Sequence, residues 1–367
     1  LKHLLLQPPV RGKVVMGFDP AYRTGCKIAV VDDIGAVVDT AVVYPTPPQN
    51  KTEQAKKTLG ALIKKHKVDI LSIGNGTASK ESEIFAAELL REQDRPVAYV
   101  MTNESGASVY SASALAAKEL PGLDVSLRSA VSIARRLQDP LAELVKIDPK
   151  SIGVGQYQHD MDAKKLDASL AGVVESCVSS VGADLNTASP ALLAHIAGIN
   201  AKTAQSICDY RREKRFETRA ELKKVKGVGE KAYRQCAGFL RVPESADPLD
   251  NTAVHPESYD AAGRLLALTG YTASDVRNGT LDALADKVEK RGKEALAAEL
   301  GIGLPTLADI VVELQKPGRD PRDELPQPVL RTDAMDIASL RVGMEFDGVV
   351  RNVADFGAFV DIGVHQD

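Results

Sequence analysis

The sequence predicts a multi-domain protein of the α/β plus α class, and three observations support this. Strand and helix patterns alternate in the first part of the chain. A helical unit then occurs twice near the middle, and period-two hydrophobicity returns at the end. The 367 residues are enough for two or three domains, and the 44% hydrophobic and 26% charged contents are those of a globular protein.

The first domain is expected to hold a mixed sheet with helices packed on it. Three apolar stretches joined by short turns, residues 14–19, 28–31 and 37–44, predict an antiparallel meander. Helical patterns then alternate with short strands, which predicts crossovers that add parallel strands. The expected helices are 52–66, 79–92 and 126–139, and the expected strands are 70–73 and 97–101.

This order resembles the RNase H-like fold, and most closely its YqgF or Holliday-resolvase-like branch, over residues 11–160. The match is carried by Gly17-Phe18-Asp19-Pro20 with Arg23-Thr24-Gly25, by Ile73-Gly74-Asn75-Gly76-Thr77, and by Asn103-Glu104 followed by Gly106-Ala107-Ser108. Nucleases of this fold hold two Mg²⁺ ions about 4 Å apart with three or four carboxylates. The resemblance implies that Asp19 and Glu104 are the first two of these acids.

The third acid of such a site is expected on the last helix of the domain, facing the first strand. Asp160, Asp162 and Asp167 lie near that place, and Asp167 fits the nuclease pattern best, but none is in register. We therefore expect Asp19 and Glu104 to be retained fold acids, with no catalysis and no metal or cofactor. The alternative is a metal-dependent nuclease or resolvase using Asp19, Glu104 and Asp167.

The middle of the chain contains one helical unit twice, at a constant offset. Leu193, Ile196, Gly198, Ile199, Asn200 and Lys202 are matched by Leu222, Val225, Gly227, Val228, Gly229 and Lys231. Each copy predicts a short helix, a tight turn that needs φ > 0, and a second helix. Such a turn leaves amide groups pointing outward as a phosphate site. The unit resembles the tandem helix-hairpin-helix family, which binds DNA and RNA backbones.

The charge distribution agrees with a phosphate-binding face in this region. The net charge is −4. Residues 186–241 hold 12 Lys/Arg and 5 Asp/Glu, so this segment carries +7 and the remainder −11. We expect the turn amides to hold phosphates, with charge from Lys202, Lys226, Lys231 and Arg234, and Asn200 in place of a second glycine to weaken the first turn. The alternative is that the module is a packing scaffold.

The end of the chain predicts the first strands of a small barrel. Residues 343–350 and 356–361 alternate with period two and resemble the opening of an S-one-type OB fold, an RNA-binding module. The resemblance implies that Phe356 and Phe359 stack on bases, each contact contributing about 1–3 kcal/mol. The alternative is that one of them is core, and Gly357 between them suggests a bulge. A complete barrel needs about 70 residues, so a truncated barrel with weak RNA binding is expected.

Other short motifs indicate no chemistry. The loop at residues 74–77 lies between a strand and a helix, where a phosphate could bind, but it lacks a P-loop signature and a tight structural turn is favoured. The four cysteines are far apart and predict buried thiols in a reducing compartment. No run approaches a membrane span. Leu1 in place of Met suggests that the sequence is part of a longer chain.

The order of these modules resembles the Tex family of bacterial transcription accessory proteins. The resemblance implies a cytoplasmic protein that binds RNA or DNA largely without sequence specificity, and a helical region upstream. A further alternative is a platform in which the small helical domain, which has no specific signature, docks on transcription or translation machinery.

The expected parts are an upstream end (1–10), the YqgF-like domain (11–160), a connecting helix (161–181), the tandem helix-hairpin-helix domain (182–243), the small helical domain (244–325), a linker (326–334) and the start of the OB fold (335–367).

Overall fold

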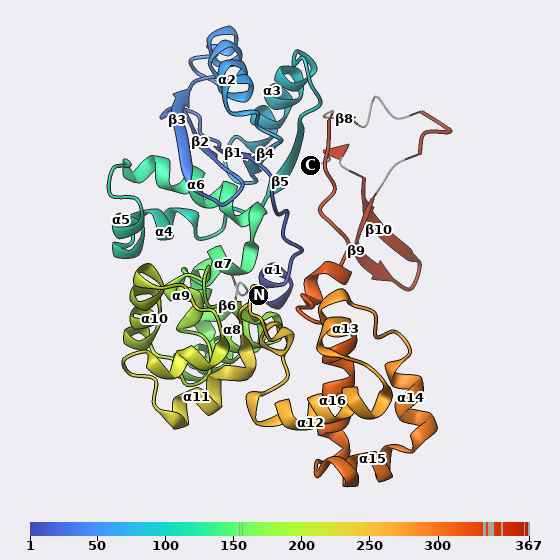
Figure 1. The fold of residues 1–367 in the computed structure, drawn as a ribbon. Coiled ribbons are helices and arrows are strands. Elements are labelled where there is room, and N and C mark those ends of the chain that lie inside the picture. Colours follow the sequence, from blue (N-terminus) through green and yellow to red (C-terminus); the bar gives the residue numbers. More distant parts are fainter. Residues whose placement is uncertain are drawn as a thin grey trace. The chain divides into compact units, whose positions relative to one another are not determined.

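The computed structural model describes residues 1–153, 155, 157–332, 335–336, 341–345, 348–362 and 364–365. The chain divides into two compact units. The first consists mainly of residues 3–161 and the chain from residue 325 onward, and the second of residues 162–324. Figure 1 colours these parts along the sequence.

The first unit is built on a five-stranded mixed sheet. Its strands are β1 (Val15–Asp19), β2 (Cys26–Val31), β3 (Val37–Val43), β4 (Ile70–Gly74) and β5 (Ala98–Thr102). The strand order is β3-β2-β1-β4-β5. β1, β2 and β3 form an antiparallel meander, whereas β4 pairs parallel with both β1 and β5. The predicted mixed sheet is confirmed.

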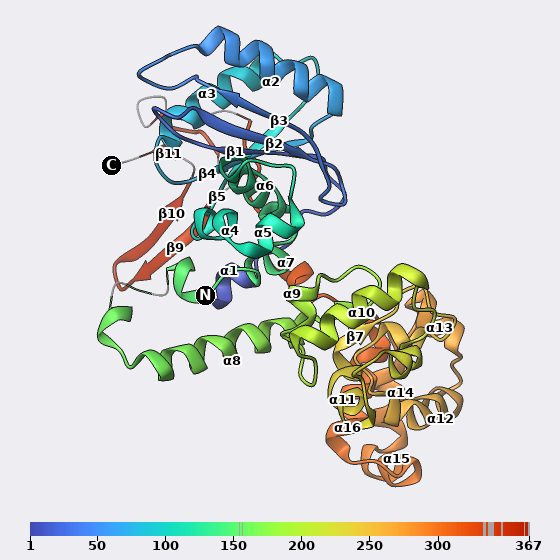
Figure 2. The ribbon, with the colours of Figure 1, turned by 90° about the vertical axis from the view of Figure 1, so that its left-hand side faces the viewer.

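Helices cover both faces of this sheet, as Figure 2 shows. One face packs against α2 (Thr52–His66) and α3 (Ser79–Arg91) through a core that includes Phe18, Leu59 and Phe85. The other packs against α6 (Val125–Gln138) through a core that includes Val15, Ala29 and Ala134. Successive residues of β1 point to opposite faces, so one strand serves both cores. The remaining helices of this part are α1 (Lys2–Leu5), α4 (Ala107–Ala112), α5 (Ala114–Glu119), α7 (Pro140–Leu144), η1 (Pro149–Ile152) and η2 (Gln158–Asp160).

Gly17 on β1 allows α6 to approach the sheet closely. A Cβ atom at Gly17 would lie 2.0 Å from the carbonyl oxygen of Ala130 on α6. Any other residue would therefore push the helix away from the strand. This close approach places the N-terminal half of α6 beside the end of β1, where Asp19 lies.

The second unit is mainly helical, and its elements fall into two halves along the sequence. Its first half comprises α8 (Ala163–Val181), β6 (Ala183–Asp184), α9 (Pro190–Leu193), α10 (Ala201–Glu213), η3 (Arg219–Lys224), α11 (Glu230–Cys236), η4 (Ala237–Phe239) and β7 (Leu240–Arg241). Its second half comprises η5 (Pro248–Asn251), η6 (Pro256–Ser258), α12 (Tyr259–Thr269), α13 (Ala273–Asn278), α14 (Leu284–Arg291), α15 (Lys293–Leu300), α16 (Leu304–Gln315) and η7 (Pro321–Glu324). α16 did not appear among the helices expected from the sequence, although its Leu307, Ile310 and Leu314 are buried in the core of this half.

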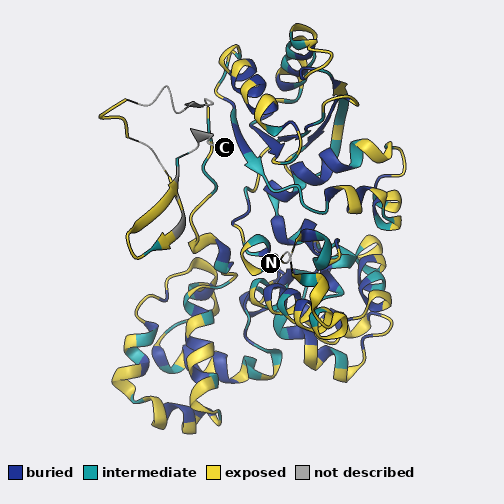
Figure 3. Cartoon of the chain, turned by 180° about the vertical axis from the view of Figure 1, so that it is seen from behind, coloured by how far each residue is buried: buried dark blue, intermediate teal, exposed yellow. Residues whose placement is uncertain are grey.

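The described C-terminal residues form two small sheets, and the expected OB-type barrel is not confirmed. β9 (Val349–Ala354) and β10 (Gly357–Asp361) make an antiparallel hairpin. Its pairing is regular at Gly357, where a bulge was suggested, and the irregularity lies further along, between Phe359 and Val360. β8 (Met335–Asp336) and β11 (Val364–His365) pair in parallel. Figure 3 shows the hairpin as exposed, in contrast to the buried strands of the mixed sheet.

Among the described helices, no single one is long and apolar enough to cross a bilayer. The pair α15 and α16 reaches the required length and composition only when counted together, and the two helices meet at 94°.

Candidate nucleic-acid interface

The two repeated turns share one backbone conformation. Gly198 has φ +80° and Gly227 has φ +93°, so each turn has one glycine in the left-handed region. Two residues later the backbone is extended, with φ −103° at Asn200 and −82° at Gly229. Neither position needs a left-handed backbone, so the difference between Asn200 and Gly229 lies in what the side chain does.

The turns differ in how the following helix begins. Asn200 caps α10, since its Oδ1 accepts a hydrogen bond from the Thr203 amide at 2.9 Å. Gly229 begins α11 without a side-chain cap. The first amides of a helix have no intrahelical acceptor and carry the positive end of its dipole. The second turn therefore leaves an amide available for a phosphate that the first turn uses internally.

The turns also differ in how tightly they are packed. A Cβ atom at Gly198 would lie 2.9 Å from Gln235 Cβ and 3.0 Å from the Ala232 carbonyl oxygen on α11. A Cβ atom at Gly227 would meet only Thr203 Oγ1 at 3.3 Å, and one at Gly229 would meet nothing within 4 Å. The first turn is thus wedged against the other copy, whereas the second is open around Gly229.

Most cations of this segment are already engaged by acids or carbonyl groups. Arg212, Lys214, Arg215, Lys223 and Lys224 lie in ion pairs. The predicted phosphate ligand Arg234 pairs through Nε with Glu257 Oε1 at 2.6 Å. Within the described ranges, Lys202, Lys226 and Lys231 are exposed and make no ion pair. The net charge of +7 for residues 186–241 therefore overstates the positive charge that a ligand would meet. Among the described residues, these three lysines are the cations that remain available to a phosphate.

Arg219 holds the short helix before the second turn in place, and sequence reasoning missed this role. Its side chain is fully buried. The guanidinium donates to the carbonyl oxygens of Leu249, Asp250, Thr252 and Val254, and the backbone amide donates to Asp250 Oδ2 at 2.9 Å. The short helix before the turn is thereby fixed to the loop that opens the next half of the unit. No local sequence signal distinguishes this arginine from its exposed neighbours.

A third turn with similar dihedral angles lies between α15 and α16. Gly301 has φ +70°, and Gly303 caps α16 with φ −75°. Gly301-Ile302-Gly303 repeats the pattern of Gly227-Val228-Gly229, so this signal was visible in the sequence. α16 contains no Lys or Arg, however, and the turn therefore lacks the cations of the second one.

The acid pair of the mixed-sheet domain is present, but the third acid is not where it was expected. The helix that packs on β1 is α6, and its Ser129 Oγ donates to Asp19 Oδ2. Asp160 lies on η2, and Asp162 caps α8. Asp167 is exposed on α8 in the other unit. Ser129 therefore occupies the place predicted for a carboxylate.

Glu104 is held inside the loop at residues 74–77. Cβ atoms at Gly74 and Gly76 would lie 2.0 and 1.7 Å from its two carboxylate oxygens, so only glycine leaves room for this side chain. Asn75 Oδ1 accepts from the Glu104 amide at 3.2 Å. The loop thus cradles a carboxylate of its own chain, in agreement with the structural-turn interpretation.

Burial is the main reason why the pKa values of Asp19 and Glu104 are both raised. Burial raises the pKa of Asp19, although the Ser129 hydrogen bond and Lys27 partly oppose this. Burial raises the pKa of Glu104, and the charge of Asp19 adds to the effect while Arg136 opposes it. Of the residues that the structure describes, no group of three His, Cys, Asp or Glu side chains is placed to hold a metal ion.

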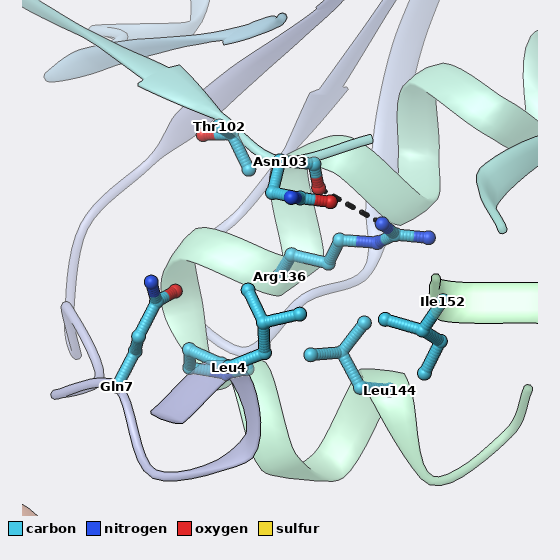
Figure 4. A pocket seen from close by; sticks show the side chains of 8 residues that line it. Leu4, Gln7, Thr102, Asn103, Arg136, Leu144 and Ile152 are labelled. Carbon is cyan, nitrogen blue, oxygen red and sulfur yellow. Dashed lines mark hydrogen bonds between the residues drawn. The ribbon is translucent and has the colours of Figure 1, made fainter. Parts of the chain in front are cut away.

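Arg136 fixes the segment that carries Glu104. Its side chain is 3% exposed, and Nη1 donates to the carbonyl oxygens of Asn103 at 2.9 Å and Ser105 at 2.8 Å. Figure 4 shows it beside a cavity of about 20 Å³ lined by Leu4, Leu144 and Ile152. That volume suits about one water and is far too small for a nucleotide. We conclude that Arg136 is a structural residue here.

The two candidate stacking residues lie close together at the tip of the C-terminal hairpin. Phe356 is in the turn rather than on a strand, and Phe359 is on β10. Their ring centroids are 6.0 Å apart with an edge-to-face angle of 83°. They are 85% and 53% exposed, so neither is core in the described hairpin.

Three protein families match successive parts of the chain. Residues 13–138 match the Tex protein YqgF-like domain, residues 178–241 the helix-hairpin-helix motif, and residues 247–322 the HHH domain. The third match corrects the view that the small helical domain has no specific signature, and it contains the turn at Gly301.

Relatives match the whole chain. "Uncharacterized protein YdcI" of Bacillus subtilis is 53% identical over 100% of this chain and 51% of its own length. "Transcriptional accessory protein Tex" of Neisseria gonorrhoeae is 51% identical over 100% of the chain and 47% of its own length. The human "S1 RNA-binding domain-containing protein 1" is 40% identical over 99% of the chain and 42% of its own length. The chain thus spans about half the length of these relatives.

Proposed function

Because the chain belongs to the Tex family of transcription accessory proteins, we propose that it binds the phosphate backbone of RNA or DNA, largely without sequence specificity, through its second helix-hairpin-helix turn. Backbone contacts position a nucleic acid without reading its bases. The chain acts as a scaffold in transcription and not as an enzyme.

One observation carries this proposal: the open and uncapped start of α11 lies beside exposed lysines. Gly229 leaves the first amides of α11 without a side-chain cap or a nearby obstruction. Lys226 and Lys231 flank the turn in the sequence and are exposed, with no ion pair among the described residues. Amides and lysines at one helix start suit a phosphate group.

Fluorescence anisotropy with labelled single strands and duplexes of several unrelated sequences tests the binding proposal. Gly229→Val adds a side chain where a phosphate would approach, so we expect weaker binding to every sequence. The thermal midpoint of the variant controls for folding. Unchanged affinity, or loss confined to one sequence, would contradict backbone binding by this turn.

The proposal that the mixed-sheet domain cleaves nothing rests on the surroundings of its acids. Ser129 lies where the third carboxylate of a nuclease was expected, and both carboxylate oxygens of Glu104 face the loop at residues 74–77. Lys27 and Arg136 supply fixed positive charge near Asp19 and Glu104, where nucleases of this fold use metal ions. Two carboxylates in these surroundings are a poor ligand set for two divalent ions.

Incubation of the chain with structured and single-stranded substrates plus Mg²⁺ or Mn²⁺ tests the scaffold against the nuclease. We expect no cleavage, with or without Asp19→Asn. Because the folded-state pKa of Asp19 is raised, its ionisation weakens folding as pH rises through that pKa, so Asp19→Asn should raise the melting temperature at pH 7.5. Cleavage that Asp19→Asn abolishes would establish the nuclease.

The C-terminal hairpin and the cellular setting complete the proposal. We propose that Phe356 and Phe359 stack on RNA bases as the first part of an OB-type module, and the exposure of both rings supports this.

The four buried free cysteines suit a reducing cytoplasm. Transcription or translation machinery is proposed as the protein partner, which crosslinking of the tagged full-length chain in cells, with and without nuclease treatment, would test.

A further inference from the structure

A segment from far along the chain pairs with the edge strand of the mixed sheet. Tyr99 on β5 and Arg331 exchange two backbone hydrogen bonds, at 2.8 Å from the Tyr99 amide and 2.9 Å from the Arg331 amide. β5 is the last strand of the sheet, and an unpaired edge would expose backbone donors and acceptors. Residues 325–332 belong to the same compact unit as the sheet, and Figure 1 shows them running beside β5.

The side chain of Arg331 reaches a carboxylate that is completely buried. Glu83 on α3 is 0% exposed. It accepts from Arg331 Nη1 at 3.3 Å and from Tyr99 Oη at 2.8 Å. A buried carboxylate is unfavourable unless it is paired and hydrogen-bonded. Arg331 therefore contacts Tyr99 through its backbone and, through its guanidinium, the acid that Tyr99 also binds.

We propose that the edge of β5, with Tyr99 and Glu83, is a docking site for an extended segment that carries an arginine, and that this chain fills it with its own residues 325–332. Backbone pairing gives affinity for an extended strand, and the buried carboxylate selects the guanidinium. The β9–β10 hairpin follows the docked arginine in the chain, so docking tethers the hairpin to the mixed-sheet domain. This inference does not depend on the nucleic-acid function.

The first test measures docking in the full chain by trypsin cleavage after Arg331 and by hydrogen exchange of the Tyr99 amide. Glu83→Gln keeps an acceptor for Tyr99 but removes the charge that holds Arg331. We expect cleavage after Arg331 to accelerate about tenfold, which corresponds to 1.4 kcal/mol, and the Tyr99 amide to lose protection. Arg319→Ala is the matched control, because Arg319 is an exposed arginine paired with Glu324, and it should change neither signal.

A second variant keeps the proposal testable if Glu83→Gln disturbs the core. Arg331→Ala alters the docked segment alone and should also deprotect the Tyr99 amide. The double variant should exchange no faster than the faster single variant, because each change breaks the same contact. Tyr99 exchange that stays at the wild-type rate in both single variants, or effects that simply add, would overturn the docking site.

Discussion

The two helix-hairpin-helix turns of this chain have the same backbone but different surroundings. In the first, Gly198 presses against α11, and Asn200 uses its side chain to cap α10. In the second, Gly227 has more room, and Gly229 leaves α11 uncapped and open. The first turn thus uses its geometry to hold the module together, whereas the second keeps its amides for a ligand.

A sequence repeat can thus separate stability from binding. Each turn abuts the second helix of the other copy, so the pair is one packing unit. Only one copy has to be buried for that unit to hold, which leaves the other free to face a ligand. Variants in the two copies can therefore be compared with each other.

The largest effect is expected on stability, from valine in place of Gly198 compared with valine in place of Gly229. Gly198→Val combines a positive φ with a clash against α11 and should lower the free energy of unfolding by about 2–4 kcal/mol. Gly229→Val has neither problem and should cost about 1 kcal/mol or less. Urea denaturation followed by circular dichroism measures both. Equal losses would show that the second turn is packed as tightly as the first.

Alanine at the equivalent lysines should separate the two turns by binding. Lys231→Ala should weaken binding and reduce the slope of log affinity against log salt by about 0.7–0.9, the value of one phosphate contact. Lys202→Ala should have a smaller effect, because its turn has one amide fewer to offer. Anisotropy titrations between low and moderate salt give both slopes. A larger change for Lys202→Ala would reverse the assignment.

Removing the acid that pairs with Arg234 should strengthen binding modestly. Glu257→Gln releases Arg234 from a pair between two largely exposed side chains, and such pairs are worth about 0.2–1 kcal/mol. We expect an affinity gain of a few-fold at most and a steeper salt dependence. Glu299→Gln, which breaks the exposed pair with Arg291 in the other half of the unit, is the control. Weaker binding by Glu257→Gln would mean that Arg234 needs this pair in the complex.

The smallest effect is expected from making the first turn like the second. Asn200→Gly frees the Thr203 amide and should cost only a few tenths of a kcal/mol of stability. A slight gain in affinity is expected, seen best with a long strand that spans both turns. A clear loss of affinity would show that the carboxamide of Asn200 itself contacts the nucleic acid.

Local patterns in the sequence predicted much of the fold. Helix 52–66 was predicted with its observed bounds, because its apolar residues follow a clear helical period and His66 ends its last basic turn. The repeated turns were visible because glycine marks a positive φ. α4 and α5 were missed, since their short runs of Ser and Ala carry no periodic signal.

The details of the sites depend on contacts between distant residues, which no local pattern reports. Ser129 meets Asp19 across 110 positions, and Arg331 meets Glu83 across 248. Glu257 masks Arg234 only because two halves of the helical unit pack together. The sequence therefore indicated candidate residues for each site, but not which of them pair with one another.

Phosphate binding by the second turn is tested most directly by the backbone amide NMR signals of the two turns. A short oligonucleotide is titrated into the deuterated, ¹⁵N-labelled full chain, and shifts are followed for residues 200–203 and 229–232. We predict large shifts at Glu230, Lys231 and Ala232 and little change at Thr203, the equivalent of Ala232, whose amide is already bonded to Asn200. Equal or larger shifts in the first turn, or none in either, would contradict the assignment of the second turn as the phosphate site.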